Sequence, residues 1–285
     1  MLRTLSSLLA VRHGFRLPPR YSTSQALVDV EVEKKFFCND AVILEVTKRA
    51  SDFQHFEMMD TYFDTAAFDL TKRDLWLRLR NGTLELKWPQ QYHESGALQS
   101  NQNIDFYNES TDRSTIVKAI RDHAAVQLFQ TPDFAESLSA GGVRPFASLS
   151  THRTRFHLTL PLPPQLGLPA SQDVFVDVDK VWFLVVGAGE DQQDTHTQEV
   201  MFGEDPQTER PHYAIGEVEF CQSQGTQAQT LSAEQKVTAM HAVFAALVID
   251  PQPVRGKVLE FIARYRPDHY AALRDAGQLA SKGIH

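Results

Sequence analysis

The sequence predicts an α+β fold, in which helices lie at the periphery of an antiparallel β-sheet or barrel. Three observations support this prediction. Short segments with alternating apolar and polar residues recur along the chain, as they do in half-buried strands. Asn81-Gly82 lies between two of these segments and is typical of a two-residue hairpin turn. Segments with helical spacing of apolar residues occur at intervals among strands that short turns separate.

The elements follow from these patterns in chain order, and they form one domain without internal repeats. Clusters of Pro, Gly and polar residues predict loops at 161–169 and 187–212, of which the second is unusually long. Period-two alternation predicts strands over 28–37, 60–64, 75–80, 83–88, 147–160, 174–185 and 213–221. Helical spacing predicts helices near 40–51, 110–123, 232–248 and 254–265.

Composition excludes several classes of protein. The chain has 285 residues, 42% of them hydrophobic and 22% charged, which is an ordinary globular balance. Its formal net charge of −8 disfavours a protein that binds nucleic acid through a broad basic surface. Cys38 and Cys221 support neither a disulfide framework nor a cysteine zinc site. No stretch reaches the roughly 18 apolar residues that a membrane-spanning helix needs. We therefore expect a protein that acts on a small molecule, without membrane or nucleic-acid partners.

The first 25 residues differ from the rest of the chain. They contain four arginines, several serines and threonines, and no Asp or Glu. This composition predicts a mitochondrial transit peptide, whereas a secretory signal needs a longer uninterrupted apolar core. The alternative is a basic tail without a targeting role, in which case the protein is cytoplasmic.

The charged faces of the predicted strands indicate the function. Successive side chains of a strand point to opposite faces, so residues two apart share one face. A sheet with a solvated polar face would explain any single strand. Carboxylate pairs, however, suit hard cations, and Arg and Lys clusters suit phosphate oxygens, so both together on one surface describe a site for a metal-bound polyphosphate. The like-charged pairs are Glu31/Glu33, Arg78/Arg80, Asp177/Asp179 and Glu217/Glu219.

Motifs in the same order resemble one protein family. Residues 31–35 (EVEKK) fit an ExExK signature, and residues 60–65 read DTYFDT. The chain from 27 to 275 thereby resembles the CYTH superfamily, the triphosphate tunnel metalloenzymes. Lys257 and residues 264–273 (RYRPDHYAAL) resemble the end of the animal-type thiamine triphosphatases within that superfamily. Further similar segments are LWLRLR at 75–80, LELKWP at 84–89, STHR at 150–153, VDVD at 176–179 and YAIGEVE at 213–219.

The resemblance implies a closed eight-stranded antiparallel β-barrel, formed by a catalytic domain over 26–275. Residues 187–212 would then be an inserted loop and 276–285 a tail. Asp179 would lie behind the metal ligands, and Arg155 competes with Arg153 for one phosphate position. The implied ligands of Mg²⁺, or of Mn²⁺, are Glu31, Glu33, Asp177, Glu217 and Glu219. The implied phosphate-binding residues are Lys35, Arg78, Arg80, Lys87, Arg153 and Lys257.

The activity implied is metal-dependent hydrolysis of thiamine triphosphate to thiamine diphosphate and phosphate by a monomer. Lys257, Tyr62, Arg78 and Arg80 would be the catalytic residues, with Tyr62 directed at a phosphate or at Lys257. Trp76 lies on the charged face, where it would either stack on the thiamine rings or pack within the barrel. The alternatives are an inorganic triphosphatase of broader specificity, an adenylate cyclase and a non-catalytic polyphosphate-binding protein. No P-loop, HExxH or GxSxG motif occurs.

Overall fold

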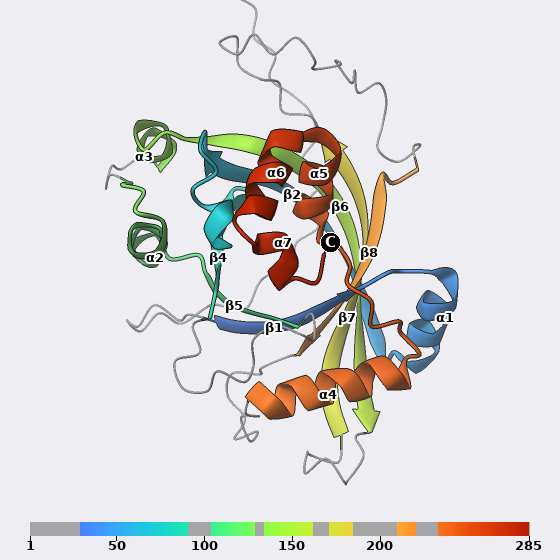
Figure 1. Ribbon diagram of the computed structural model, residues 1–285. Coiled ribbons are helices and arrows are strands. Elements are labelled where there is room, and N and C mark those ends of the chain that lie inside the picture. Colours follow the sequence, from blue (N-terminus) through green and yellow to red (C-terminus); the bar gives the residue numbers. More distant parts are fainter. Residues whose placement is uncertain are drawn as a thin grey trace, which may run out of the picture.

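Eight antiparallel strands form a closed barrel in the order β1-β5-β4-β3-β2-β6-β7-β8, and β8 pairs back with β1 (Figure 1). The computed structural model describes residues 29–90, 104–128, 134–161, 171–184, 210–220 and 233–284. The strands are β1 (Asp29–Phe36), β2 (Asp52–Thr65), β3 (Trp76–Arg80), β4 (Thr83–Pro89), β5 (Asp105–Ser110), β6 (Val143–Pro161), β7 (Ser171–Leu184) and β8 (Tyr213–Phe220). The closed eight-stranded barrel confirms the predicted fold class.

Helices surround this barrel, as predicted. They are α1 (Asp40–Arg49), α2 (Arg113–Ala124), α3 (Phe134–Ala140), α4 (Ala233–Ala246), α5 (Lys257–Tyr265), α6 (Pro267–Asp275) and α7 (Gln278–Ser281), with a short 3-10 helix, η1 (Thr71–Arg73). Figure 1 shows α5, α6 and α7 grouped on one side of the barrel and α4 across its lower end. The residue pattern alone had not predicted β5, α3, α6 or α7.

The hydrophobic core lies outside the barrel wall, between the strands and these helices. Apolar residues of β1 and of β6 to β8 pack against α1 and α4, those of β3 and β4 pack against α2 and α3, and α5 to α7 cover parts of β2, β6 and β7. Because side chains alternate along a strand, burying the apolar face outward turns the polar face inward. The amphipathic strands therefore give the barrel a charged interior.

The Asn81-Gly82 turn forms the predicted hairpin between β3 and β4. Both residues have positive φ, 47° and 81°, as a type I′ turn requires. The Asn81 side chain also accepts from the amide of Met59 at 2.8 Å and donates to the carbonyl of Glu57 at 3.1 Å. The turn residue thereby fixes the hairpin against β2, which sets the position of the arginines on β3.

Close packing at one glycine joins β1 to β8. Gly216 pairs with Phe36 across the two strands, and a Cβ atom on Gly216 would lie 2.0 Å from the Phe36 ring. The ring is fully buried and packs edge-on against Phe244 of α4. Only glycine leaves room for it.

Helix α6 is joined to the connection between β2 and β3 by a buried histidine. His269 is stacked on Phe68 with ring centroids 4.0 Å apart, and its Nε2 lies 2.7 Å from the Thr71 hydroxyl. That hydroxyl donates to Asp64 at 2.6 Å, so it can only accept from His269. Nε2 therefore carries a proton. Burial together with Arg266 lowers the pKa of His269 to about 4, which favours the neutral ring at pH 7.

Residues 276–284, which belong to the expected tail 276–285, contain α7 and pack onto the barrel. Leu279 and Ile284 are buried in the same apolar cluster as Phe261 of α5. The expected transit peptide (1–25) and residues 187–209 of the expected insertion lie outside the described residues. Among the helices that the structure describes, none has the length and apolar character to cross a bilayer.

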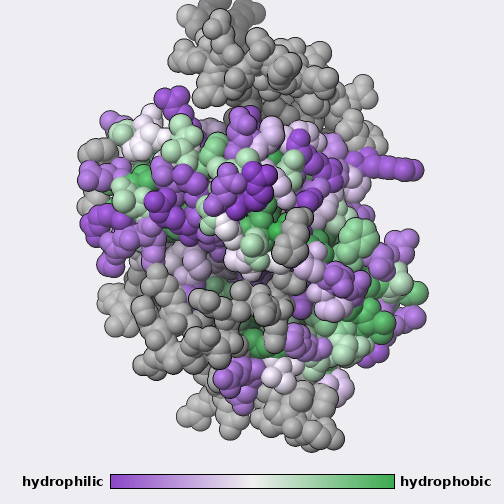
Figure 2. Space-filling model, viewed as in Figure 1, coloured by the Kyte–Doolittle hydropathy of each residue, from purple (hydrophilic) through white to green (hydrophobic). Residues whose placement is uncertain are grey.

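The outer surface is unevenly polar. Figure 2 shows hydrophilic side chains over the face that carries α5 to α7, and more hydrophobic ones toward α1. Phe37 and Leu44, which lie beside and within α1, are exposed. Single exposed apolar residues of this kind are normal for a globular protein.

Candidate active site

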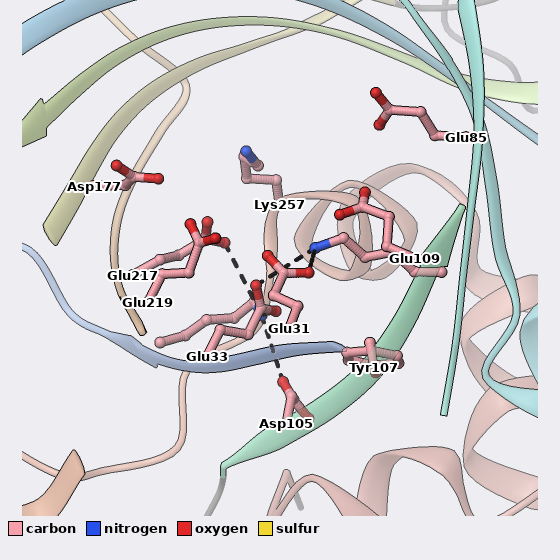
Figure 3. Close-up of polar contacts among 12 residues, drawn as sticks. Glu31, Glu33, Glu85, Asp105, Tyr107, Glu109, Asp177, Glu217, Glu219 and Lys257 are labelled. Atoms are coloured by element: carbon pink, nitrogen blue, oxygen red, sulfur yellow. Dashed lines mark hydrogen bonds and ion pairs between the residues drawn. The ribbon is translucent and has the colours of Figure 1, made fainter. Parts of the chain in front are cut away.

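The barrel encloses a cavity of about 790 Å³, and the predicted functional side chains line it. They come from β1, β2, β3, β4, β6 and β8 and from the start of α5, and Figure 3 shows the acidic members gathered around the centre. The predicted residues that line the cavity are Glu31, Glu33, Lys35, Tyr62, Trp76, Arg78, Arg80, Lys87, Arg153, Glu217, Glu219 and Lys257. Of the predicted set, Asp177 is the one that does not.

Two arginines of β3 form one wall. The Arg78 side chain donates to Glu85 at 2.8 Å and to Glu109 at 3.0 Å, and its Nη1 lies 3.5 Å from the Tyr62 hydroxyl. Arg80 donates two hydrogen bonds to the fully buried Asp60, at 2.7 and 2.8 Å. Both guanidinium groups are thus oriented by carboxylates before any ligand binds, which limits the entropy lost on binding.

Two lysines face the acidic residues of β1. Lys87 pairs with Glu31 and lies 3.6 Å from Glu33. Lys35 pairs with Glu33 and lies 3.4 Å from Asp105. Lys35 and Glu33 share the inward face of β1, as the alternation predicts, and the pairing of β1 with β5 places Asp105 opposite Glu33.

Strand β6 contributes both Arg153 and Arg155 to the cavity. Arg153 donates to Asp179 at 2.7 and 2.8 Å and to Glu217 at 2.7 Å. Arg155 donates to Asp177 at 2.8 and 2.7 Å and to Glu219 at 2.6 Å. Arg153 and Arg155 are thus held in the same way, so the structure does not favour either of them for the single phosphate position that the family resemblance implied.

Asp177 and Asp179 are fully buried behind these arginines. Asp177 contacts both Arg153 and Arg155, while Asp179 contacts Arg153 and accepts from Lys257 at 2.6 Å. Asp179, expected behind the metal ligands, lies behind Arg153 and Lys257. Asp177, which the family resemblance implied as a metal ligand, here holds the arginines from behind.

Lys257 is the first residue of α5 and reaches the cavity from outside the sheet. Its side chain is 7% exposed, and its Nζ is held by Asp179. The Tyr62 hydroxyl lies 3.5 Å from Nη1 of Arg78, and both Tyr62 and Lys257 line the cavity. Lys257 thereby adds a cation to the cavity from the first turn of α5.

The two glutamates of β1 have pKa values that are shifted in opposite directions. Burial raises the pKa of Glu31 to about 8, because Glu33, Glu109 and Glu219 reinforce burial and together outweigh Lys87. For Glu33 burial acts in the same direction, but Lys35 and Lys87 prevail and hold its pKa well below the ordinary value. The pKa values of the two glutamates are thus displaced in opposite directions, that of Glu31 chiefly by burial and that of Glu33 by the two lysines.

The donor set fits a hard divalent cation. Glu31, Glu33, Glu217 and Glu219 present only carboxylate oxygens to the cavity, which is the chemistry that Mg²⁺ and Mn²⁺ prefer. Within the described residues, no three acidic, His or Cys side chains stand ready as a preformed metal centre. Each of the four glutamates pairs with a Lys or Arg instead, so a metal would have to replace those cations.

Two residues of the DTYFDT segment contact the site, and a third stabilises the fold. Asp60 and Tyr62 contact the two arginines of β3. Asp64 accepts from the backbone amides of Leu70 and Thr71 at 2.9 and 3.0 Å, which fixes the start of η1. The last acidic residue of the segment is thus structural.

Comparison with known proteins identifies the family. The model of the CYTH domain matches residues 29–240, which is most of the chain. The chain belongs to the CYTH family. A thiamine-triphosphatase of Macaca fascicularis is 25% identical over 246 residues, which cover 86% of this chain and 89% of the relative.

Solved structures of low identity are also similar. The PH1819 protein of Pyrococcus horikoshii OT3 is 16% identical with a TM-score of 0.44, over 83% of this chain and 99% of that one. An adenylyl cyclase from Hippeastrum, whose structure is described as revealing a dominant triphosphatase activity, is 13% identical with a TM-score of 0.44, over 83% and 98%.

The sequence analysis did not predict several of the residues that line the cavity. Asp105, Tyr107 and Glu109 of β5 line the cavity, and so do Asp74 and Lys282. Asp105, Tyr107 and Glu109 are two residues apart, so they share one face of a strand, and this spacing could have indicated the strand. The alternate positions are Phe106, Asn108 and Ser110, of which only Phe106 is apolar, so the strand was not recognised.

Proposed function

We propose that this CYTH protein hydrolyses thiamine triphosphate to thiamine diphosphate and phosphate with the aid of a divalent metal ion. The observation that carries the proposal is the mixture of cations and carboxylates on one cavity wall. A triphosphate carries about four negative charges near neutrality. Cations neutralise and orient such a chain, whereas carboxylates weaken its binding unless they hold metal.

The proposed roles follow from the positions of the side chains. Lys35, Lys87, Arg78 and Arg80 would bind phosphate oxygens from one part of the wall, and Arg153 and Lys257 from another. Glu31, Glu33, Glu217 and Glu219 would hold the metal ion, with Mg²⁺ as the first candidate. When bound, that ion would supply charge neutralisation and a more acidic water.

Trp76 supports the organic part of the proposal. It lies at the cavity wall next to Lys87 in the β3–β4 register, and its indole Nε1 donates to Asp74 at 2.8 Å. The ring is therefore held in place and offers a flat apolar surface to the aminopyrimidine or to the thiazolium. The family relative that is a thiamine-triphosphatase points to the same substrate.

The test is phosphate release by the full chain from equal concentrations of thiamine triphosphate, inorganic triphosphate and ATP. We expect hydrolysis with Mg²⁺, none with excess EDTA, and recovery when Mg²⁺ is restored. We expect kcat/KM to be highest for thiamine triphosphate. Equal or faster use of inorganic triphosphate would replace the proposal with a broader triphosphatase, and tight binding without turnover would replace it with a polyphosphate-binding protein.

We also propose that residues 1–25 direct the protein to mitochondria. Their arginines and the lack of acidic residues support this location. A fluorescent protein fused after residue 25 should enter mitochondria and lose that localisation when the four arginines are replaced by glutamine. A cytoplasmic signal from the unchanged fusion would contradict it. The expected monomeric state and the absence of nucleic-acid binding remain predictions.

A further inference from the structure

The C-terminal segment contributes a cation to the cavity that the proposed reaction does not use. Ser281, Lys282 and Ile284 line the cavity next to α5. Leu279 and Ile284 anchor this segment because both side chains are buried in the apolar cluster of α5 and α6. Lys282 is thereby held at a fixed place in the wall, with its side chain 18% exposed.

Lys282 lies in a cluster of polar groups at one end of the site. Its Nζ donates to the Tyr107 hydroxyl at 2.6 Å and lies 3.3 Å from Asp74 and 3.4 Å from Asp105. The Tyr107 hydroxyl in turn donates to Asp74 at 3.0 Å. Burial opposes the charge of Lys282, but Asp105 and Asp74 prevail and raise its pKa, so the side chain is a cation at neutral pH.

This cluster adjoins the aromatic ring that would receive the organic end of a substrate. Oδ1 of Asp74 accepts from the Trp76 indole at 2.8 Å and also lies 3.3 Å from Lys282 Nζ. The lysine and the indole thus share one carboxylate oxygen. Asp105 also lies 3.4 Å from Lys35, so the cluster continues into the phosphate-binding wall.

Lys282 offsets part of the negative charge at this end of the cavity. Asp74, Asp105 and Glu33 carry three negative charges, and Lys35, which pairs with both Glu33 and Asp105, and Lys282 carry two positive ones. Without Lys282 the negative excess would be larger by one charge, which attracts a cationic ring and repels phosphate. With Lys282, a cationic thiazolium beside Trp76 gains little from the two aspartates.

We propose that Lys282 is a specificity-determining residue, which weakens binding of a cationic organic group at Trp76 and favours substrates that are anionic along their whole length. This inference rests on the proposed function, in that the cavity must bind a triphosphate. It adds that Lys282 reduces the preference for thiamine triphosphate over inorganic triphosphate that stacking on Trp76 would otherwise give.

The test compares the full chain with Lys282→Met and Lys282→Arg. For each protein, kcat/KM is measured with Mg²⁺ for thiamine triphosphate and inorganic triphosphate, and Kd for both is measured by calorimetry in EDTA, where we expect no turnover. Lys118→Met is the matched control, because Lys118 is 70% exposed on α2, away from the cavity. We expect Lys282→Met to shift both ratios toward thiamine triphosphate by about tenfold, or about 1.4 kcal/mol. Lys282→Arg and the control should keep the wild-type ratios within twofold.

The outcomes separate this inference from the proposed function. Equal losses for both substrates in Lys282→Met would mean that the lysine only anchors the C-terminal segment, which overturns the inference. The same shift in Lys282→Arg would also overturn it, because the charge is retained. A wild-type chain that binds both compounds without turnover would overturn hydrolysis, while the ratio of Kd values would still support or refute the role of Lys282. A wild-type chain that neither hydrolyses nor binds either compound, with Mg²⁺ as well as in EDTA, would overturn both.

Discussion

Replacing Arg78 with alanine removes the more buried of the two cations on β3. The residue is 7% exposed, and its guanidinium contacts Glu85, Glu109 and Tyr62. Loss of a fixed charge that acts on the transition state costs on the order of 10²–10³ in kcat, or about 2.7–4 kcal/mol. The two glutamates would also lose a partner, and breaking a buried ion pair costs about 3–5 kcal/mol of stability. These glutamates are partly exposed, so we expect a stability loss below that range and a large loss of activity.

The assay must separate the two effects. We would measure the free energy of unfolding in urea and, under conditions where the variant is folded, the initial rate of phosphate release with saturating Mg²⁺. Arg78→Lys should recover part of the rate, since it keeps the charge but loses the forked contacts with both glutamates. Arg49→Ala, on the exposed face of α1, is the control. A folded Arg78→Ala protein with kcat/KM within about threefold of wild type would refute the role of Arg78 at the phosphates.

Three further predictions concern Trp76, the contact between Gly216 of β8 and Phe36 of β1, and the buried His269. Trp76→Ala should lower kcat/KM for thiamine triphosphate by about 10-fold or more and change that for inorganic triphosphate by less than threefold, because only the first has rings to stack; equal losses in a substrate-comparison assay would contradict this. Gly216→Ala should lower the free energy of unfolding by about 1–3 kcal/mol, since the new methyl group displaces Phe36, and an unchanged urea midpoint would contradict the close contact. The pKa of His269 is lowered to about 4 in the folded chain, chiefly by burial and then by Arg266, against an unfolded value of about 6.5. This shift corresponds to about 3 kcal/mol of stability, which is present above pH 6.5 and lost as the pH falls toward 4. Urea unfolding of His269→Gln should therefore depend less on pH over this interval than that of wild type.

Most of the strands that line the cavity could be predicted from the sequence because their residues alternate regularly between charged and apolar. Alternation in β1, β3, β4, β7 and β8 separates charged from apolar residues, and the side that each residue faces follows directly. The inward positions of Glu31, Arg78 and Glu217 were thus predictable before any coordinates. Closure into eight strands was not predictable from alternation, because seven segments were recognised and pairing between distant strands leaves no local signal; it came from the family resemblance.

The remaining parts of the site depend on contacts between distant segments. Lys282 follows α7, in a stretch whose apolar residues are too few to reveal a helix by their spacing. Its place in the cavity results from the burial of Leu279 and Ile284 against α5, which is a tertiary effect. Asp177 could be assigned to the correct face of β7, but its partners could not be predicted, because the register with β6 decides that Arg155 lies opposite.

The balance of charge in the cavity favours a metal-dependent enzyme over a simple polyphosphate carrier. Eight Lys or Arg side chains and seven Asp or Glu side chains line it, so the wall as a whole is nearly neutral. A site of this kind gains little Coulomb energy from a ligand with about four negative charges. Binding improves only when the carboxylates exchange their lysine and arginine partners for a divalent ion, which frees those cations for the phosphates. Removal of metal should therefore weaken triphosphate binding as well as stop hydrolysis, whereas a carrier built for phosphate alone would have omitted the carboxylates.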